Sequence, residues 1–449
     1  MSTFDLMSQA VENYKDTILS AERHIWHHPE SGYREWKTHA YMKEQFESLG
    51  YTITEAGNIP GFYTDVETGT PGPKLAIFAE MDSLIVPTHP ESDPDTGAVH
   101  ACGHHAQCAA MLGIAAALKA PGALGNLSGS IRLIVVPAEE GIEIEYRRQL
   151  MEQGVIRYIS GKLEFMHRGI LDGVDLAMMV HTSAANGIGC ARGSNGCIVK
   201  EAIFHGKSAH AGGSPHAGIN ALYAANTALQ AANALRETFR EVDTIRFHPI
   251  ITSGGSAVNA IPDRVTIESY LRGATMSAIQ KENEKVNRAF AGAAVSMGCG
   301  LTLRDIHGYA PRFYPADFKQ VFRDVASLLV SEDQLNFNEN WGTGCSDMGD
   351  VSCVMPAIHP TAGGAVGTGH GSDYYISDPY LACVVSAKLQ VGVIDRLLCN
   401  DAEKAKSIVA AYQPEYASIQ EYLQAVDQMN FDGDAVTYQN DGTIRIRYK

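Results

Sequence analysis

Three short apolar runs punctuate the first 190 residues, and each one ends in polar side chains. The runs are LAIFAEM (75–81), IRLIVVPA (131–138) and VDLAMMVH (174–181), and helical stretches separate them. Continuous apolar runs of this length are typical of parallel strands that are buried on both faces. The sequence therefore predicts an α/β fold with a mostly parallel sheet flanked by helices. Its polar groups then lie at the carboxyl edge of the sheet, where open α/β sheets bind ligands.

From about Ser194 the pattern changes to strands with one wet face. CIVKEAIFHGKSAH and RVTIESYLRG alternate polar and apolar residues, and two helical stretches accompany them. This order predicts a small α+β domain with a four-stranded sheet and two helices. Because the α/β pattern resumes after about Tyr309, we predict one large domain formed by 1–193 and 307–449, with a domain inserted at 194–306. Near the end of the chain, Asn440 to Gly442 predict a hairpin turn.

Composition excludes several classes of partner. The chain carries 35 basic and 51 acidic residues, for a net charge of −16. Nucleic acids and anionic membranes bind basic surfaces, so neither is an expected partner. The first 26 residues show helical spacing rather than a signal-peptide pattern, and no apolar stretch is long enough to span a membrane. The nine cysteines are scattered and odd in number, which is not the pattern of a disulfide framework. We expect a soluble, cytoplasmic protein.

The densest group of metal-binding residue types is HACGHH, residues 100–105. Three imidazoles and a thiol on a glycine-containing loop can place Cys102 and His104 on one ion, because both are ligands of zinc and similar metals. A polar turn that satisfies its own hydrogen bonds is the alternative interpretation.

Glu139 and Glu140 lie in PAEEG, directly after the second apolar run. Adjacent carboxylates at a strand end suit one metal ligand beside one general base, whereas two solvated acids at a helix N-terminus are the alternative. His181 closes the third run, and His370 lies in the glycine-rich segment GGAVGTGHGSDYY. Either histidine by itself could be structural.

Together these motifs resemble the aminoacylase and glutamate-carboxypeptidase metallohydrolases. Within that family they resemble the amidohydrolase subgroup of hippurate, indoleacetyl-amino-acid and aminobenzoyl-glutamate hydrolases and acetyl-diaminopimelate deacetylases. The resemblance runs from residue 23 to about 395. Seven motifs carry it in the family's order: AEMDSL, HACGHH, PAEEG, MMVH, GKSAHAGGSPHAGINA, GGSAVNAIPD and GTGHGSDYY. The resemblance implies a zinc-peptidase-like catalytic domain with an inserted lid and dimerisation domain.

The resemblance also implies roles for single residues. Two divalent ions, Mn²⁺ or Zn²⁺ with Co²⁺ possible, would be held by Cys102, His104, Glu140, His181 and His370. Glu139 would be the general base, and Asp82 would orient a metal-bound histidine. His210 would reach into the partner's active site of a homodimer, with higher oligomers possible. Asn259 and Arg272 would hold the carboxylate or tetrahedral oxygen of the substrate.

The implied reaction is hydrolysis of the amide bond of a small molecule, an N-acyl amino acid or a dipeptide-like substrate, by a metal-activated water. Aminobenzoyl-glutamate-type carboxypeptidase and deacetylase activities are alternatives with the same mechanism. Two other interpretations are a cysteine hydrolase with Cys102 as nucleophile and a binding protein that has lost turnover. The chain departs from the family at 141–173, which is longer than usual, and past about residue 400, where the tail has no counterpart.

Overall fold

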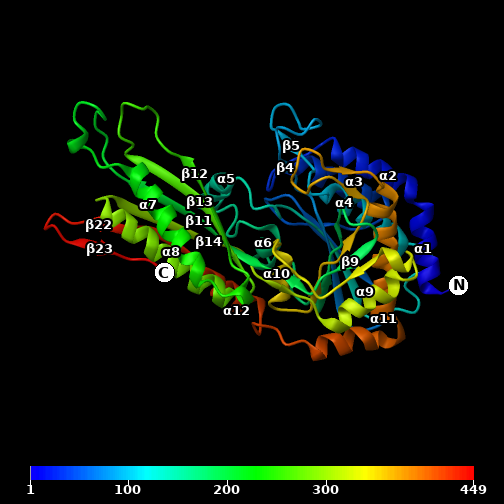
Figure 1. Cartoon of the computed structure of the whole chain (residues 1–449). Helices are drawn as coiled ribbons and strands as arrows, with labels where there is room; N and C mark the ends of the chain where they lie inside the picture. Colours follow the sequence, from blue (N-terminus) through cyan, green and yellow to red (C-terminus); the bar gives the residue numbers. More distant parts are fainter. Residues whose placement is uncertain (1) are drawn as a thin grey trace. The chain divides into compact units, whose positions relative to one another are not determined.

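The computed structural model describes residues 2–449 and divides the chain into two compact units (Figure 1). The first unit comprises Met1–Gly193, Phe313–Trp341 and Ser346–Ile419. The second comprises Ser194–Arg312, Gly342–Cys345 and Gln420–Lys449. The second unit thus holds Gln420–Lys449, which the sequence-based domain assignment placed in the catalytic part.

A six-stranded sheet of order β1-β2-β6-β3-β7-β18 forms the centre of the first unit. Its strands are β1 (Thr54–Glu55), β2 (Phe62–Glu67), β3 (Lys74–Glu80), β6 (Ser130–Val136), β7 (Leu176–Met178) and β18 (Ala357–Ile358). The three apolar runs form β3, β6 and β7. β3 pairs in parallel with both β6 and β7, and β18 pairs in parallel with β7. The predicted mostly parallel sheet is confirmed, with an antiparallel margin formed by β1 and β2.

Helices and short strands surround this sheet. The helices are α1 (Thr3–Asn13), α2 (Lys15–Trp26), α3 (Trp36–Ser48), α4 (His104–Leu118), α5 (Ile144–Glu152), α6 (Gly161–His167), α9 (Ala316–Ala326), α10 (Met348–Ser352) and α11 (Ser386–Ala411). The short strands are β4 (Leu84–Ile85), β5 (Ala98–Val99), β8 (His181–Thr182), β9 (Ile188–Cys190), β16 (Leu335–Phe337), β19 (Thr361–Ala362), β20 (Ala365–Val366) and β21 (Tyr375–Ile376). β16, β9, β19 and β8 form a second, four-stranded sheet.

Helix α4 is the central helix of this unit, because nearly all of its side chains are buried. Its alanine-rich sequence lets it pack closely against α1, α2, α11 and β3. The helix begins after Gly103, which has a φ of 93°. A Cβ at this glycine would lie 2.1 Å from the Thr182 hydroxyl and 2.3 Å from that of Tyr374, so no larger residue fits. The glycine fixes where α4 starts, and therefore where His104 lies.

The second unit is built on a six-stranded antiparallel sheet of order β12-β13-β11-β14-β22-β23. Its strands are β11 (Gly196–His205), β12 (Arg246–Ser253), β13 (Arg264–Gly273), β14 (Gly300–Tyr309), β22 (Phe431–Tyr438) and β23 (Ile444–Ile446). Helices α7 (Ala221–Ala234) and α8 (Met276–Ser296) pack against each other and on the sheet, as Figure 1 shows. Helix α12 (Ile419–Met429) leads into β22.

The C-terminal tail explains the difference from the predicted domain boundary. The four predicted strands are present, but β22 adds to the edge of β14, from Leu301↔Val436 to Asp305↔Phe431. β23 then pairs with β22 through a turn at Gly442, where φ is 83°. The C-terminal tail belongs to the second unit because backbone hydrogen bonds join β22 to β14. Among residues 2–449, no helix is long and apolar enough to cross a membrane.

Candidate metal centre

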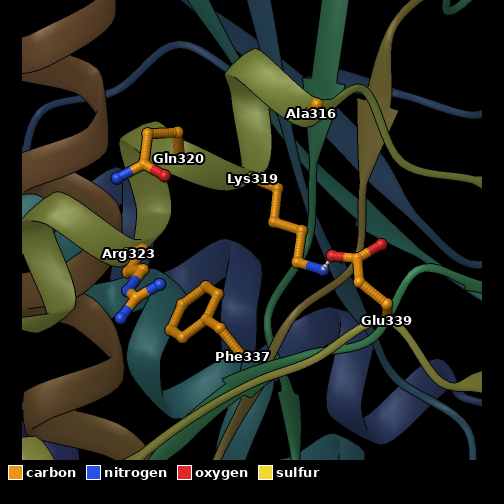
Figure 2. A pocket seen from close by; sticks show the side chains of 6 residues that line it. All are labelled: Ala316, Lys319, Gln320, Arg323, Phe337 and Glu339. Carbon is orange, nitrogen blue, oxygen red and sulfur yellow. Dashed lines mark hydrogen bonds and ion pairs between the residues drawn. The ribbon is translucent and has the colours of Figure 1, made fainter.

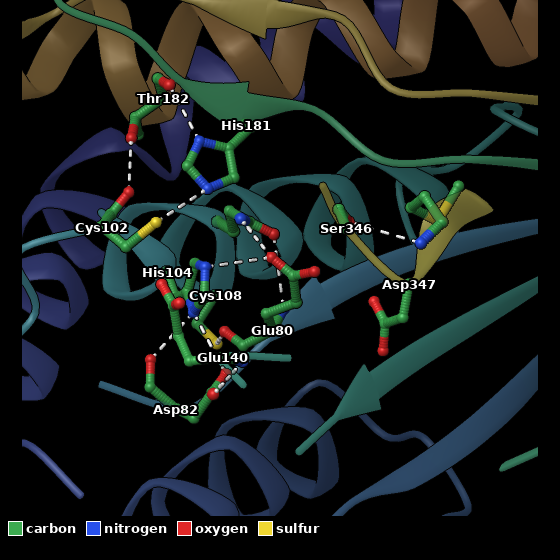
Figure 3. A network of polar contacts seen from close by, with 12 residues as sticks. Glu80, Asp82, Cys102, His104, Cys108, Glu140, His181, Thr182, Ser346 and Asp347 are labelled. Atoms are coloured by element: carbon green, nitrogen blue, oxygen red, sulfur yellow. Dashed lines mark hydrogen bonds and ion pairs between the residues drawn. The ribbon is translucent and has the colours of Figure 1, made fainter. Parts of the chain in front are cut away.

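The predicted ligands come from loops at the carboxyl edge of the central sheet, where successive strands bring them together (Figure 3). Cys102 precedes α4 and His104 is its first residue, while Glu140 follows β6 and His181 begins β8. His370 has a left-handed backbone, with a φ of 66°. Its N–H donates to the Ala101 carbonyl at 2.9 Å, which ties the glycine-rich segment to the cysteine loop.

The structure groups the donor atoms of these residues into three overlapping triads. Within each triad the donor atoms lie within 4.8 Å of one another. The triads are Cys102, His104 and His181; Cys102, Glu140 and His370; and His104, Glu139 and Glu140. We call the set formed by Cys102, His104, Glu140, His181 and His370 the donor cluster. Cys102, His104 and Glu140 each belong to two of these triads, so the triads form one continuous group of donors.

The chemistry of the donor atoms and their missing hydrogen bonds fit a bound cation. Cys102 Sγ lies 3.4 Å from His181 Nε2, and Glu140 Oε1 lies 3.4 Å from His370 Nε2. His104 Nε2 and Glu140 Oε1 are buried and make no hydrogen bond within the described residues. Buried polar atoms are rarely left without a partner. An imidazole nitrogen, a carboxylate oxygen and a thiol are ligands of divalent transition metals, so one or two such ions would satisfy these atoms.

Asp82 orients two members of the donor cluster, His104 and Glu140. Its Oδ1 lies 3.1 Å from His104 Nδ1, and its Oδ2 accepts the Glu140 N–H at 2.8 Å. Because its backbone oxygen also faces Nδ1 at 2.9 Å, the His104 proton belongs on Nδ1, which leaves Nε2 free to bind an ion. Burial alone would raise the pKa of Asp82, but the hydrogen bonds from His104 and Glu140 hold that pKa at about 2.

His181 is oriented in the same way, by a backbone carbonyl. Its Nδ1 lies 2.9 Å from the Thr182 oxygen, so Nε2 faces the Cys102 thiol. Thr182 in turn donates its hydroxyl to the Cys102 carbonyl at 3.1 Å. Both histidines therefore present Nε2 to the donor cluster, and in each case a protein oxygen selects the tautomer.

Glu139 stands between the donor cluster and a second group of carboxylates. Burial raises the pKa of Glu139 well above its ordinary value, and the negative charges of Glu80 and Glu140 raise it further. A carboxyl group with a raised pKa can carry a proton near neutral pH, as a general acid and base must. The geometry places Glu139 where that chemistry would be used, within 4.8 Å of the ligand atoms of His104 and Glu140.

The second group contains a lysine that sequence reasoning missed. Lys162 Nζ lies 2.5 Å from Glu80 Oε1 and 2.5 Å from Asp347 Oδ1, and all three side chains are fully buried. We call these residues the lysine cluster. Burial lowers the pKa of Lys162, but Asp347 and Glu80 hold it above its ordinary value, so the ammonium stays charged. Apart from Glu80 in AEMDSL, no local pattern signalled this cluster.

Three predicted residues lie in the second unit. His210 is exposed, and its Nδ1 accepts the N–H groups of Gly212 and Gly213 at 3.2 and 2.9 Å. Asn259 is its neighbour, because the Asn259 carbonyl accepts the Ala211 N–H at 2.9 Å. Arg272 lies on β13, and its guanidinium donates to the Thr343 carbonyl at 3.3 Å. Within the second unit the structure thus brings His210 and Asn259 together.

Figure 2 shows a separate pocket on the first unit, beside α9 and β16. Ala316, Lys319, Gln320, Arg323, Phe337 and Glu339 line it. The Lys319 ammonium pairs with Glu339 at 2.7 Å, so the pocket's lysine is already neutralised. None of these residues belongs to the donor cluster, and the pocket takes no part in the site.

Sequence comparisons show that this chain is similar to known amide and peptide hydrolases. The profile of the M20 peptidase dimerisation domain matches residues 191–296. The mouse (Mus musculus) Xaa-Arg dipeptidase is 27% identical over 79% of this chain and 78% of its own length. The p-aminobenzoyl-glutamate hydrolase of Escherichia coli has a subunit that is 26% identical, over 66% of this chain and 76% of its own.

Solved structures share the fold. A putative aminohydrolase from methicillin-resistant Staphylococcus aureus superposes with a TM-score of 0.69 at 23% identity, covering 88% of this chain and 99% of its own. A Bacillus subtilis protein described as a dinuclear metal-binding peptidase of the M20 family superposes with a TM-score of 0.65 at 19% identity, covering 86% and 99%.

The relatives hydrolyse amide or peptide bonds, and this chain is a hydrolase of the same kind. Its grouped donor atoms could hold a metal ion. Residues 191–296 match the peptidase dimerisation domain, which places the chain among the hydrolases that carry this domain. The chain carries the dimerisation domain of the M20 peptidases and is similar to amide and peptide hydrolases over 66 to 79% of its length. The family, fold class and enzyme class predicted from the motifs are confirmed.

Proposed function

We propose that this protein hydrolyses the amide bond of an N-acyl amino acid or a dipeptide-like substrate, with two divalent ions held by the donor cluster. The observation that carries the proposal is the convergence of thiol, imidazole and carboxylate donor atoms within 4.8 Å of one another, beside a buried Glu139. When bound, Mn²⁺ or Zn²⁺ would supply Lewis acidity, which lowers the pKa of water and polarises a carbonyl. The first unit is then the catalytic domain, and residues 194–306 form a lid and dimerisation domain.

Glu139 moves the proton in this mechanism. It takes the proton from the attacking water and later gives it to the leaving amine, which its raised pKa permits. Asp82 keeps His104 in the tautomer that presents Nε2 to the ions. A nucleophilic role for Cys102 is not favoured, because burial and the charge of Glu140 raise the pKa of its thiol well above the usual range, whereas a nucleophilic cysteine needs a lowered one.

The Glu139→Gln variant tests the assignment of the base. Replacing the carboxylate should lower kcat by a factor of about 10² to 10⁴, because general acid and base catalysis contributes that much. Metal content should not change, since the five donors remain. Glu145→Gln is the matched control, because Glu145 is an exposed acid on α5. Unchanged turnover in Glu139→Gln with a normal metal content would refute the mechanism.

The substrate class is proposed from the relatives and tested by a screen. Relatives include an indole-3-acetyl-aspartic acid hydrolase and an N-acetyl-L-cysteine deacetylase besides the dipeptidase. Manganese- or zinc-loaded protein should release amine from N-acyl amino acids, dipeptides or p-aminobenzoyl-glutamate. Asn259 and Arg272 are proposed to hold the free carboxylate of the substrate, since a guanidinium pairs with a carboxylate at two points. Equal cleavage of substrates with and without that carboxylate would exclude this role.

We further propose a homodimer that forms through β12 and completes the site. β12 is the outer strand of its sheet, and Ile250 and Ile251 on it are 61% and 39% exposed. An exposed apolar edge strand favours pairing with a second copy. Ile250→Lys should shift the protein toward monomer in light scattering. His210 of the partner subunit would polarise the scissile carbonyl.

A mixing experiment tests whether His210 acts between subunits. His210→Ala and Glu139→Gln should each be inactive alone. After subunit exchange, mixed dimers carry one complete site, so activity should return to about a quarter of wild type. No recovery would place His210 in its own subunit's site. A cytoplasmic location is also proposed, supported by nine cysteines that are all free thiols.

A further inference from the structure

Helix α5 carries one side chain that differs from all its others. The helix lies in the segment after the two carboxylates that is longer than the family's usual one, and Arg147 is its single buried residue. Arg147 is only 1% exposed, although arginine is almost never fully buried unless it is paired. Its neighbour Arg148 remains on the surface and pairs with Glu145 and Glu152. The burial of Arg147 therefore calls for a specific partner.

The partners of Arg147 are backbone carbonyls on both sides of Glu139. Its guanidinium donates to the carbonyl oxygens of Ala138, at 3.5 Å, and of Glu140. A third bond, at 2.7 Å, goes to the carbonyl of Ile159. The planar fork of arginine can reach several acceptors at once, which a lysine ammonium does less well. Arg147 thus holds the carbonyl groups of the two residues on either side of the proposed base.

The clamped turn has a backbone that needs support. Ala138 has a left-handed conformation, with a φ of 56°, which residues other than glycine rarely adopt. Its N–H donates to Glu35 Oε1 at 2.8 Å, and the Glu140 N–H donates to Asp82. Glu35 and Asp82 therefore hold the N–H groups of this turn, and Arg147 holds its carbonyls.

Neighbouring residues make room for the Arg147 side chain and hold its helix in place. A Cβ at Gly32 would lie 2.4 Å from an Arg147 nitrogen, so only glycine leaves room for the guanidinium. Arg34 fastens the helix from outside, since its guanidinium lies 3.5 Å from the ring centre of Tyr146 and pairs with Glu143 at 3.3 Å. The longer segment thus places the buried Arg147 side chain at the turn formed by Ala138, Glu139 and Glu140.

We propose that Arg147 is a positioning residue that fixes the Glu139–Glu140 turn, and that α5 serves to supply it. The inference rests on the proposed function, because it assigns Glu139 as base and Glu140 as ligand. Loss of the clamp would release the strained turn and misplace both carboxylates. The proton-transfer step and one metal position would suffer together, while substrate contacts made by other residues would not.

Arg147→Met and Arg147→Lys test this, with Arg148→Ala as the matched control on the same helix. We expect Arg147→Met to lower kcat about 10- to 100-fold, the usual cost of losing a residue that orients a metal ligand, with KM changed less than about threefold. Cobalt-loaded protein should show altered visible absorption bands and weaker binding of one ion. Arg147→Lys should recover part of kcat, because an ammonium can still reach one or two of the carbonyls. Arg148→Ala should match wild type in every measurement.

Other outcomes overturn the inference. Wild-type kcat and an unchanged cobalt spectrum in Arg147→Met would show that the turn holds itself. A kcat that returns to the wild-type value once Arg147→Met is assayed well below its melting temperature would reduce the role to stability. Should Arg147→Met fail to fold, Arg147→Lys gives the same two readouts. If wild-type protein cleaves no amide, the proposed function fails, but the cobalt spectra still decide the role of Arg147.

Discussion

The fully buried lysine cluster and the partly exposed donor cluster lie side by side at the carboxyl edge of the first unit's sheet, and they balance charge differently. In the lysine cluster, Lys162 supplies a cation to Glu80 and Asp347. In the donor cluster, Glu140 and the thiol of Cys102 face imidazoles instead of a lysine, and two buried ligand atoms make no hydrogen bond within residues 2–449. The two groups are in contact, because Glu80 Oε2 lies 3.2 Å from His104 Nε2 (Figure 3).

The difference shows how a chain separates stability from catalysis within a few ångströms. A buried carboxylate pair with its own ammonium is complete on folding, and removing one partner exposes the full cost of an uncompensated charge. Donors without a cation add little to folding, but they provide the affinity for an ion. Variants in the lysine cluster should therefore affect stability first, and variants in the donor cluster should affect turnover first.

The largest effect is expected from Cys102→Ala in the donor cluster. Losing the ligand shared by two triads should remove several kcal/mol of transition-state stabilisation, on the order of 10³-fold in turnover. The free energy of unfolding of the metal-free protein should change by only about 1 kcal/mol, because Cys102 is partly exposed and Ala removes a single sulfur atom. Steady-state kinetics and metal analysis measure the first effect, and urea unfolding measures the second. Cys383→Ala, a buried thiol in another part of the unit, should keep its turnover.

The opposite result is expected from Lys162→Met in the lysine cluster. It leaves two buried carboxylates without their cation and should lower the free energy of unfolding by about 3 to 5 kcal/mol, measured in urea. Lys388→Met is the control, since Lys388 pairs with the partly exposed Glu12 at 2.6 Å and should cost at most about 1 kcal/mol. A similarly small loss for Lys162→Met would mean that Glu80 and Asp347 are protonated and carry no charge.

The two clusters also differ in how well the sequence predicts them. Cys102, His104 and Glu140 sit in short motifs at strand ends, and the topology of a parallel sheet brings strand ends to one edge. The sequence therefore indicated which residues would lie near one another, and their role as metal ligands stays a prediction. Lys162 and Asp347 are 185 residues apart and lie in no recognisable pattern. Their pairing depends on where α6 and the segment before α10 pack, which only the folded chain decides.

The fold shows the same limit. Apolar runs predicted β3, β6 and β7 because burial on both faces leaves a plain signal in the sequence. The hairpin around Gly442 was also readable, since its turn chemistry is local. What the sequence did not indicate is that β22 pairs with β14, because any exposed edge of an antiparallel sheet could accept such a strand.

Glu22 gives a test of intermediate size, because its cation is only partly buried. The Glu22 side chain is 2% exposed, whereas that of Arg23 is 49% exposed. Burial raises the pKa of Glu22, but hydrogen bonds from Arg23 and His105 bring it to about 2, below the ordinary 4.5. A lowered pKa stabilises the fold above the unfolded pKa and loses that effect as pH falls toward 2. The contribution is about 3 kcal/mol at pH 7 and about half of that at pH 3.

Urea unfolding of chelator-treated wild type and Glu22→Gln at pH 7, 5, 4 and 3 measures this contribution. The two unfolding free energies should approach each other as the pH falls below about 4.5. A gap that stays constant over this range would show that the Glu22 carboxylate is not held by its cations. In that case the Glu22–Arg23 pair would add no pH-dependent stability to the fold.

The smallest effect on stability is expected at Asp65, because water as well as Arg132 stabilises its charge. Asp65 is 27% exposed and accepts two hydrogen bonds from Arg132, at 2.8 and 2.6 Å. Asp65→Asn should cost about 1 kcal/mol in urea unfolding, because Arg132 also donates to the Ile170 carbonyl and the Asp65 carboxylate is itself open to water. Salt at 1 M should roughly halve the difference, since screening weakens exposed pairs. Lys162→Met should show no such salt dependence. If both variants respond alike to salt, burial is not what separates the lysine cluster from an ordinary surface pair.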